Sequence, residues 1–170
     1  MVPGDRYRVF LDPAFTPTEV DAALSASENL MGEIPDLSLT ITVSACSGTH
    51  AGEICIHRGM RADQAGDPTI DGYTWTTGEC PDKRGDSGGL LGIDGGETWI
   101  DVEHVYGLVP SYPKALQHTF EHEMGHAMGL KHHPGALMGA NFVGASMEAT
   151  CDDAAQYYFI RYRSAPDCKP

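Results

Sequence analysis

The sequence predicts one α+β domain whose sheet begins with parallel strands. The chain has 170 residues, which is an ordinary length for one domain with its own core. Segments of period two alternate with segments of helical period. A strand at 7–12, a helix at 16–32 and a strand at 37–43 follow one another. Strand, helix, strand in this order indicates a right-handed βαβ-like crossover, which makes the two strands parallel.

The first helix has the clearest start in the chain. Tyr7–Asp12 reads as a strand that Pro13 ends, and the sequence Thr16-Pro17-Thr18-Glu19 follows it. Threonine at the N-cap, proline in the first turn and glutamate three residues after the threonine form a capping-box pattern. The helix is expected to continue to about Gly32. Its predicted buried stripe consists of Val20, Ala23, Leu24, Ser27, Leu30 and Met31.

Two strands and a long segment without periodicity come next. Leu37–Val43 alternates and is rich in β-branched residues, and Glu53–His57 is a short third strand. Residues 58–96 are dense in Gly, Asp and Pro, and read as one irregular segment. Irregular segments of this length are usually functional or stabilised by an ion. Ca²⁺ is therefore a candidate structural ion, although no EF-hand spacing is present and ordinary loop solvation is the favoured interpretation.

The second half of the chain contains one more strand and two helices. Thr98–Val105 alternates and is expected to be an edge strand beside a substrate cleft. A helix is predicted from about 113 to 129, with Leu116, Phe120, Ala127 and Met128 as buried contacts. A last helix runs from a Thr150 cap to about Tyr162, with Asp152 and Asp153 in its first turn.

Composition narrows the range of partners. The formal net charge is −13, which disfavours nucleic acid and anionic membranes because both would repel the protein. The sequence shows no transmembrane span and no signal peptide, and its start reads as trimmed, so the missing signal says little about the gene. We expect a monomer.

Five cysteines suggest the compartment. Cys46 and Cys55 are close enough in sequence to form a disulfide that bridges a loop. Cys151 and Cys168 could form a second disulfide between the last helix and the tail, and Cys80 would then be the odd cysteine. Two disulfides are typical of a secreted protein, whereas in the cytosol the same residues would be buried thiols. We expect disulfides and an extracellular location.

The stretch from His122 to His132 carries the chemistry. It reads H-E-x-x-H-x-x-G-x-x-H. On a helix, His122 and His126 project from one face and can hold one zinc ion, and Glu123 can act as general base toward a water at the metal. Gly129 can end the helix at positive φ and bring His132 back as a third ligand. Three ligands leave the fourth position open, as a catalytic site requires.

The residues HEMGHAMGLKHH, followed closely by PGALM, resemble the metzincin clan of zinc peptidases. They are most similar to the matrixin branch, which includes the matrix metalloproteinases and bacterial relatives, and the bacterial relatives are the expected group. The resemblance implies His122, His126 and His132 as zinc ligands, Glu123 as catalytic base and Met138 as the Met-turn residue beneath the metal. It also implies an α+β fold with a twisted, mostly parallel sheet and two long helices.

In that fold an upper subdomain, about 1–130, covers a small irregular lower subdomain, about 131–170, with a C-terminal helix. The chain departs from the matrixin pattern at several places. His133 stands where matrixins usually have Ser and is an alternative third ligand, although the spacing favours His132. The wall after the Met-turn is replaced by residues 139–142, and His57 and His104 are expected to be ordinary histidines rather than ligands of a structural zinc.

The predicted function is therefore that of a zinc-dependent endopeptidase. A substrate would lie extended along 98–105, which makes Trp99, Ile100 and Asp101 candidate substrate-binding residues, with Phe142 at the altered wall. The alternative is a metzincin-fold binding or inhibitor protein without catalysis. The presence of Glu123 and of all three ligand histidines favours the enzyme.

Overall fold

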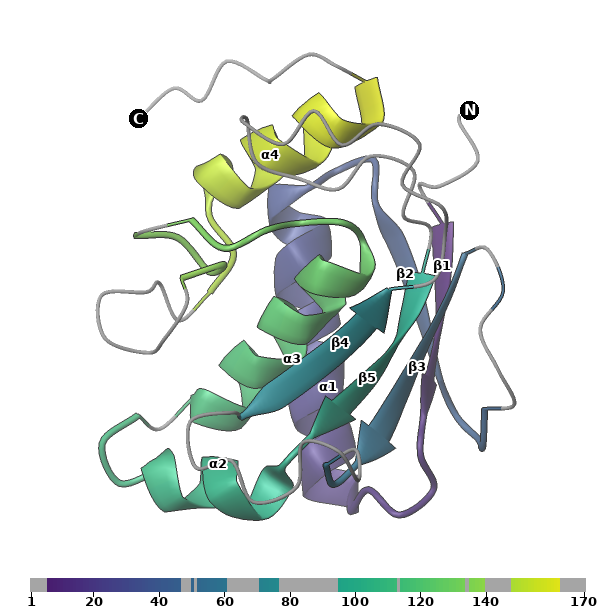
Figure 1. Ribbon diagram of the computed structural model, residues 1–170, viewed down its shortest axis with the longest axis vertical. Coiled ribbons are helices and arrows are strands. Elements are labelled where there is room, and N and C mark those ends of the chain that lie inside the picture. Colours follow the sequence, from purple (N-terminus) through teal and green to yellow (C-terminus); the bar gives the residue numbers. More distant parts are fainter. Residues whose placement is uncertain are drawn as a thin grey trace.

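The fold was examined in a computed structural model, which describes residues 6–46, 50, 52–60, 71–76, 95–112, 114–133, 135–139 and 148–162. The described residues form an α+β fold with a five-stranded, mostly parallel sheet and four helices (Figure 1). The elements in chain order are β1 (Arg6–Leu11), α1 (Pro17–Glu33), β2 (Ser38–Val43), β3 (Glu53–Arg58), β4 (Gly72–Thr76), β5 (Gly95–Ile100), α2 (Val102–Leu108), α3 (Ala115–Ala127) and α4 (Cys151–Tyr162).

The strand order is β2-β1-β3-β5-β4, and only β4 runs antiparallel to its neighbour. Tyr7 pairs with Leu39 between β1 and β2, so the predicted parallel strand–helix–strand unit is confirmed. β5 lies between β3 and β4, and β4 forms the edge of the sheet. A strand that binds a further extended chain must therefore be β4 on this side of the sheet.

Helix α1 begins as its sequence indicates. The Thr16 hydroxyl accepts a hydrogen bond from the Glu19 amide, and the Glu19 carboxylate accepts one from the Thr16 amide, which completes the capping box. Ala23, Ala26 and Leu30 of α1 are fully buried. Leu24 was predicted in the buried stripe, but it is 42% exposed because it lies on the outer flank of the helix.

The prediction of an edge strand at Thr98–Val105 is wrong in extent and in position. β5 ends at Ile100, and Asp101 then caps α2 by accepting a hydrogen bond from the His104 amide. Val102 and Val105 are both buried, and their spacing of three places them on one face of a helix but on opposite faces of a strand. This spacing and the Asp101 cap both favour the helix.

The prediction that 58–96 is wholly irregular is also wrong, because β4 lies within it. Its residues Tyr73, Thr74, Trp75 and Thr76 are all of types that favour strands. Residues 61–70 and 77–94, which contain most of the candidate Ca²⁺ ligands of this segment, lie outside the described part.

Helices α1 and α3 lie beside each other against one face of the sheet (Figure 1). Their shared core continues into α4 through Ala154 and Tyr157. A disulfide joins Cys46, just after β2, to Cys55 in β3, a pairing that their short spacing had made possible. Cys151 is disulfide-bonded as well, and its expected partner Cys168 lies outside the described residues. No described helix combines the length and the apolar character needed to span a bilayer.

Candidate metal centre

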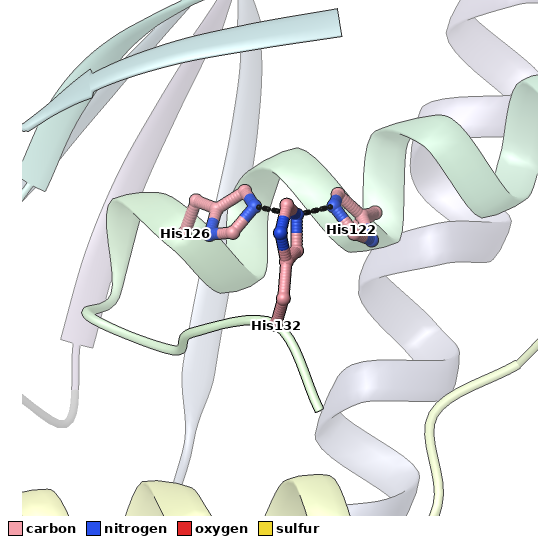
Figure 2. A group of neighbouring side chains, drawn as sticks. All are labelled: His122, His126 and His132. Carbon is pink, nitrogen blue, oxygen red and sulfur yellow. Dashed lines mark hydrogen bonds between the residues drawn. The ribbon is translucent and has the colours of Figure 1, made fainter. Parts of the chain in front are cut away.

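Three histidines from two segments meet at one point. His122 and His126 project from the same face of α3, and His132 comes from the segment that follows the helix (Figure 2). The Nε2 atom of His132 lies 3.1 Å from Nε2 of His122 and 3.0 Å from Nε2 of His126. The sequence prediction that these three side chains converge agrees with the geometry.

The turn that returns His132 is built around Gly129. Gly129 has φ of 97°, a conformation in which glycine carries no steric penalty. The Leu130 amide bonds the Gly125 carbonyl at 2.9 Å, and the Gly129 amide bonds the His126 carbonyl at 2.9 Å. This pair of hydrogen bonds is a Schellman motif, which ends the helix and reverses the chain.

Backbone carbonyls fix the tautomers of the two helical histidines. Nδ1 of His122 donates to the Leu137 carbonyl at 3.0 Å, and Nδ1 of His126 donates to the Leu130 carbonyl at 2.8 Å. Because Nδ1 carries the proton, each Nε2 presents a lone pair to the centre of the cluster. Burial lowers the pKa of His122 to about 3 and of His126 to about 4, and the neighbouring imidazoles add to the effect. Burial also lowers the pKa of His132.

This donor set fits a zinc ion. Neutral imidazoles whose lone pairs face one another at about 3 Å repel unless a cation lies between them. Tetrahedral zinc with bonds of about 2.1 Å places its ligand nitrogens about 3.4 Å apart, close to the separations found here. Among the described residues, His122, His126 and His132 are the only group of three or more potential ligands. Three imidazoles with an open fourth position are typical of catalytic zinc.

Glu123 follows the first ligand but points to the sheet. Its side chain is buried, and its Oε2 accepts a hydrogen bond from the Thr74 hydroxyl of β4 at 2.5 Å. Burial raises the pKa of Glu123 to about 7, the Thr74 hydrogen bond opposes that rise, and the nearby Asp71 adds to it. A carboxylate with a pKa near neutrality can accept a proton and release it again.

Met138 lies directly beneath the ligand helix. It is fully buried, and a Cβ atom added to Gly125 would come within 2.6 Å of the Met138 sulfur. Gly125 is therefore required for the thioether to approach the backbone between the two helical ligands. Sequence reasoning placed Met138 in this role by resemblance, and its position under α3 is consistent with an apolar floor.

A buried carboxylate supports the turn that contains Met138. Asp153 of α4 is fully buried and accepts hydrogen bonds from the amides of Leu137, Met138 and Thr150 at 3.1, 3.2 and 2.9 Å. The Leu137 carbonyl is the group that orients His122. Asp153 therefore acts on the metal ligand through one intervening residue.

His133, the alternative third ligand, faces away from the cluster. Its Nδ1 donates to the Lys131 carbonyl at 3.1 Å, and its Nε2 lies 3.3 Å from Oδ1 of Asp153. The spacing argument for His132 over His133 agrees with this geometry.

The candidate substrate-binding residues do not lie on a free edge. Ile100 is fully buried in the core, and Asp101 caps α2. Trp99 of β5 stacks on His57 with ring centroids 5.1 Å apart, and it lies 6.5 Å from the Tyr73 ring. Phe142 lies outside the described residues.

His57 and His104, which were predicted not to bind a structural zinc, lie beside other partners. His57 belongs to the stack with Trp99, and Nε2 of His104 lies 3.0 Å from Oδ1 of Asp71. Neither belongs to a group of three potential ligands among the described residues.

Sequence reasoning missed the contribution of β4. Thr74 bonds Glu123, and Gly72 lies against the same carboxylate. The signal was the run Tyr73–Thr76, in which every residue favours a strand, but the surrounding Gly and Asp residues obscured it.

No family model matches the sequence, and no curated protein matches it. Among solved structures the chain is similar to high choriolytic enzyme 1 (HCE-1), a hatching enzyme zinc-protease from Oryzias latipes (medaka fish). The identity is 12% and the TM-score 0.36, and the match covers 76% of this chain and 46% of that chain, which is less than half of its length. A TM-score this low establishes neither a shared fold nor a shared function.

Proposed function

We propose that this protein is a zinc-dependent endopeptidase of the metzincin type, and that it acts on extended peptide segments of protein substrates. One observation carries the proposal: three imidazole Nε2 atoms converge at one point, and the residue that follows the first of these histidines is a buried carboxylate bonded to the edge strand of the sheet. The matrixin branch and a bacterial source remain predictions from the motif. The two cysteine pairs favour a secreted protein.

His122, His126 and His132 would hold the zinc ion. Bound zinc supplies Lewis-acid chemistry, because it lowers the pKa of a water and polarises a carbonyl. Glu123 takes the proton of the attacking water and delivers it to the leaving amine. Its pKa near 7 in this buried position suits both transfers. The carbonyls of Leu137 and Leu130 keep the two helical ligands in the tautomer that binds metal.

The substrate would add to β4 rather than to β5. β4 is the outermost strand on the side of α3, and its residues Gly72 and Thr74 contact Glu123. An extended peptide paired with the outer edge of β4 would therefore pass close to the catalytic base. Main-chain pairing accepts many sequences, so selectivity would come from side-chain pockets along the strand.

The first prediction concerns Glu123. The Glu123→Ala variant is expected to bind zinc with the stoichiometry of the parent and to lose at least about 100-fold in peptide hydrolysis, because proton transfer by a positioned base contributes this much or more. Zinc content is measured by atomic absorption. Hydrolysis is measured by digestion of casein and by cleavage of a fluorogenic peptide library. If the variant cleaves as fast as the parent, the role of Glu123 is wrong.

A binding or inhibitor protein without catalysis is the competing function. It predicts that the zinc-loaded parent shows no cleavage that a chelator abolishes. His132→Ala serves as the matched control, because it removes one ligand but leaves Glu123 and β4 unchanged. Chelator-sensitive cleavage by the parent, with none by His132→Ala, would exclude the competing function.

A further inference from the structure

We propose that Thr74 of β4 is a positioning residue that holds the Glu123 carboxylate in its working orientation. This inference rests on the proposed function and adds a residue outside the zinc-binding motif. The Thr74 hydroxyl lies 2.5 Å from Oε2 of Glu123 and 3.2 Å from the Glu123 carbonyl oxygen. One side chain of the edge strand thus contacts both the side chain and the backbone of the residue proposed as base.

The direction of these hydrogen bonds follows from counting protons. The working form of a general base is the ionised carboxylate, which can only accept, so in that form the single hydroxyl proton of Thr74 is donated to Glu123. The Thr98 hydroxyl lies 2.9 Å from the Thr74 hydroxyl and must then donate to it. Thr98 is fully buried in β5. The two threonines therefore form an ordered chain of donors that ends on the carboxylate, and each bond strengthens the next.

Gly72 restricts the same carboxylate from a second direction. A Cβ atom at Gly72 would lie 2.7 Å from both Cγ and Oε1 of Glu123. The side chain thus occupies space that only a glycine on β4 leaves free. Thr74 engages Oε2, which leaves Oε1, beside Gly72, as the oxygen that we assign to the reacting water.

The consequence is that β4 would have two roles at once. Its outer edge would pair with the substrate, while Thr74 on the same strand fixes the base. A peptide that shifts β4 would also shift Glu123, and misplacing a catalytic group by about 1 Å can cost about 100-fold in rate. Peptides that pair well with β4 without shifting it are therefore expected to show a higher kcat as well as a lower KM.

The test compares Thr74→Val, which keeps the shape but removes the hydroxyl, with Thr74→Ser, which keeps the hydroxyl. Thr74→Val is expected to lower kcat by about 10- to 100-fold with KM changed less than about threefold. Thr74→Ser is expected to recover most of that loss. Thr40→Val, at an exposed position of β2, is the matched control for the same chemical change and is expected to leave kcat unaltered. Zinc content is measured for every variant.

Dependence on Glu123 is tested in a second background. If Thr74 acts through Glu123, Thr74→Val has less than about a twofold effect on the residual rate of Glu123→Ala. An equal loss in both backgrounds, or a Thr74→Val variant as active as the parent, would overturn the proposal.

A measurement on metal-free protein separates this inference from the proposed function. Urea unfolding in chelator is carried out for the parent, Thr74→Val, Glu123→Ala and the double variant. The effect of the double variant on the unfolding equilibrium constant is expected to differ about tenfold from the product of the two single effects, as for a hydrogen bond to a charged group. A double effect equal to that product would overturn the contact even in an active enzyme. A tenfold difference in a protein without chelator-sensitive cleavage would instead refute the proposed function.

Discussion

Ionisable side chains are buried at high density on helix α3. His118, Glu121 and Glu123 are almost fully buried there, and His122 and His126 are half-buried. Burying a group that can carry charge costs stability unless a partner compensates it. His122, His126 and Glu123 have a role in the proposed site, whereas Glu121 points to the other side of the helix, toward Ala149. Glu121 is therefore the residue at which a structural cost can be measured apart from catalysis.

Glu121 is predicted to make stability depend on pH. Burial raises the pKa of its carboxyl from the usual 4.5 to about 8. Between these values the folded protein retains the proton and the unfolded chain does not, so unfolding releases a proton and stability falls as pH rises. The slope is at most about 1.4 kcal/mol per pH unit. Glu121→Gln, which stays neutral, is expected to lose this slope in urea unfolding between pH 5 and pH 8.

The measurement is made on metal-free protein, so that zinc binding adds no pH dependence of its own. The depressed pKa values of His122 and His126 contribute a slope of opposite sign below about pH 6.5, and this slope is common to both proteins. The difference between parent and variant therefore reports Glu121 alone. Parallel stability curves for the two proteins would show that Glu121 is ionised in the fold.

Among the elements, α4 supports the metal centre although it supplies no ligand. Its first turn contributes Asp153, whose carboxylate receives the amides of Leu137 and Met138. The Leu137 carbonyl in turn orients His122. Thr150 donates to the same carboxylate from both its amide and its hydroxyl, at 2.9 and 2.7 Å. The start of α4 and the turn at Met138 are thus joined through one buried side chain.

Replacing Asp153 is predicted to weaken both folding and metal binding. Asp153→Ala leaves three buried amides without an acceptor and is expected to cost about 3 kcal/mol of unfolding free energy. Zinc affinity is expected to fall about 10- to 100-fold, because Leu137 would no longer hold His122 in place. Both are measured, by urea unfolding and by competition with a zinc chelator.

Asp153→Asn is the matched comparison, because its side-chain carbonyl can still accept hydrogen bonds. Its effects on stability and zinc affinity are expected to lie between those of the parent and of Asp153→Ala. Unchanged zinc affinity in both variants would contradict the link from α4 to His122.

At the scale of the whole molecule, the metal would join two parts of the chain that lie on either side of the turn at Gly129. His122 and His126 belong to α3, which packs on the sheet, and His132 belongs to the segment that leads to α4. A ligand that binds only the folded state stabilises it by mass action, by about 4 kcal/mol at a thousand times the dissociation constant.

Removal of zinc is therefore predicted to lower the melting temperature by roughly 10 °C for a chain of this size. The measurement is a thermal melt followed by circular dichroism with and without a chelator. His132→Ala is expected to melt near the temperature of the metal-free parent and to respond weakly to the chelator. A parent that melts at the same temperature in both conditions would mean that the histidines hold no stabilising ion.

Much of this protein could be predicted from local sequence. The capping box fixed the start of α1, the spacing of His122 and His126 placed two imidazoles on one helix face, and Gly129 at positive φ returned His132. These features depend on residues within a few turns of one another, so short-range geometry is sufficient. The short spacing of Cys46 and Cys55 allowed their pairing but did not establish it.

Tertiary structure alone decided which strand forms the edge and what surrounds Glu123. The residues of β5 were predicted to form an edge strand. β5 is internal, however, because β4, from a segment rich in Gly and Asp, pairs with it on the outside. Thr74 is 49 residues from Glu123, and Asp153 is 16 residues from Leu137. The partner of a strand, and the hydroxyl or amide that reaches a buried carboxylate, depend on long-range packing. The local spacing of apolar residues does not specify those long-range partners.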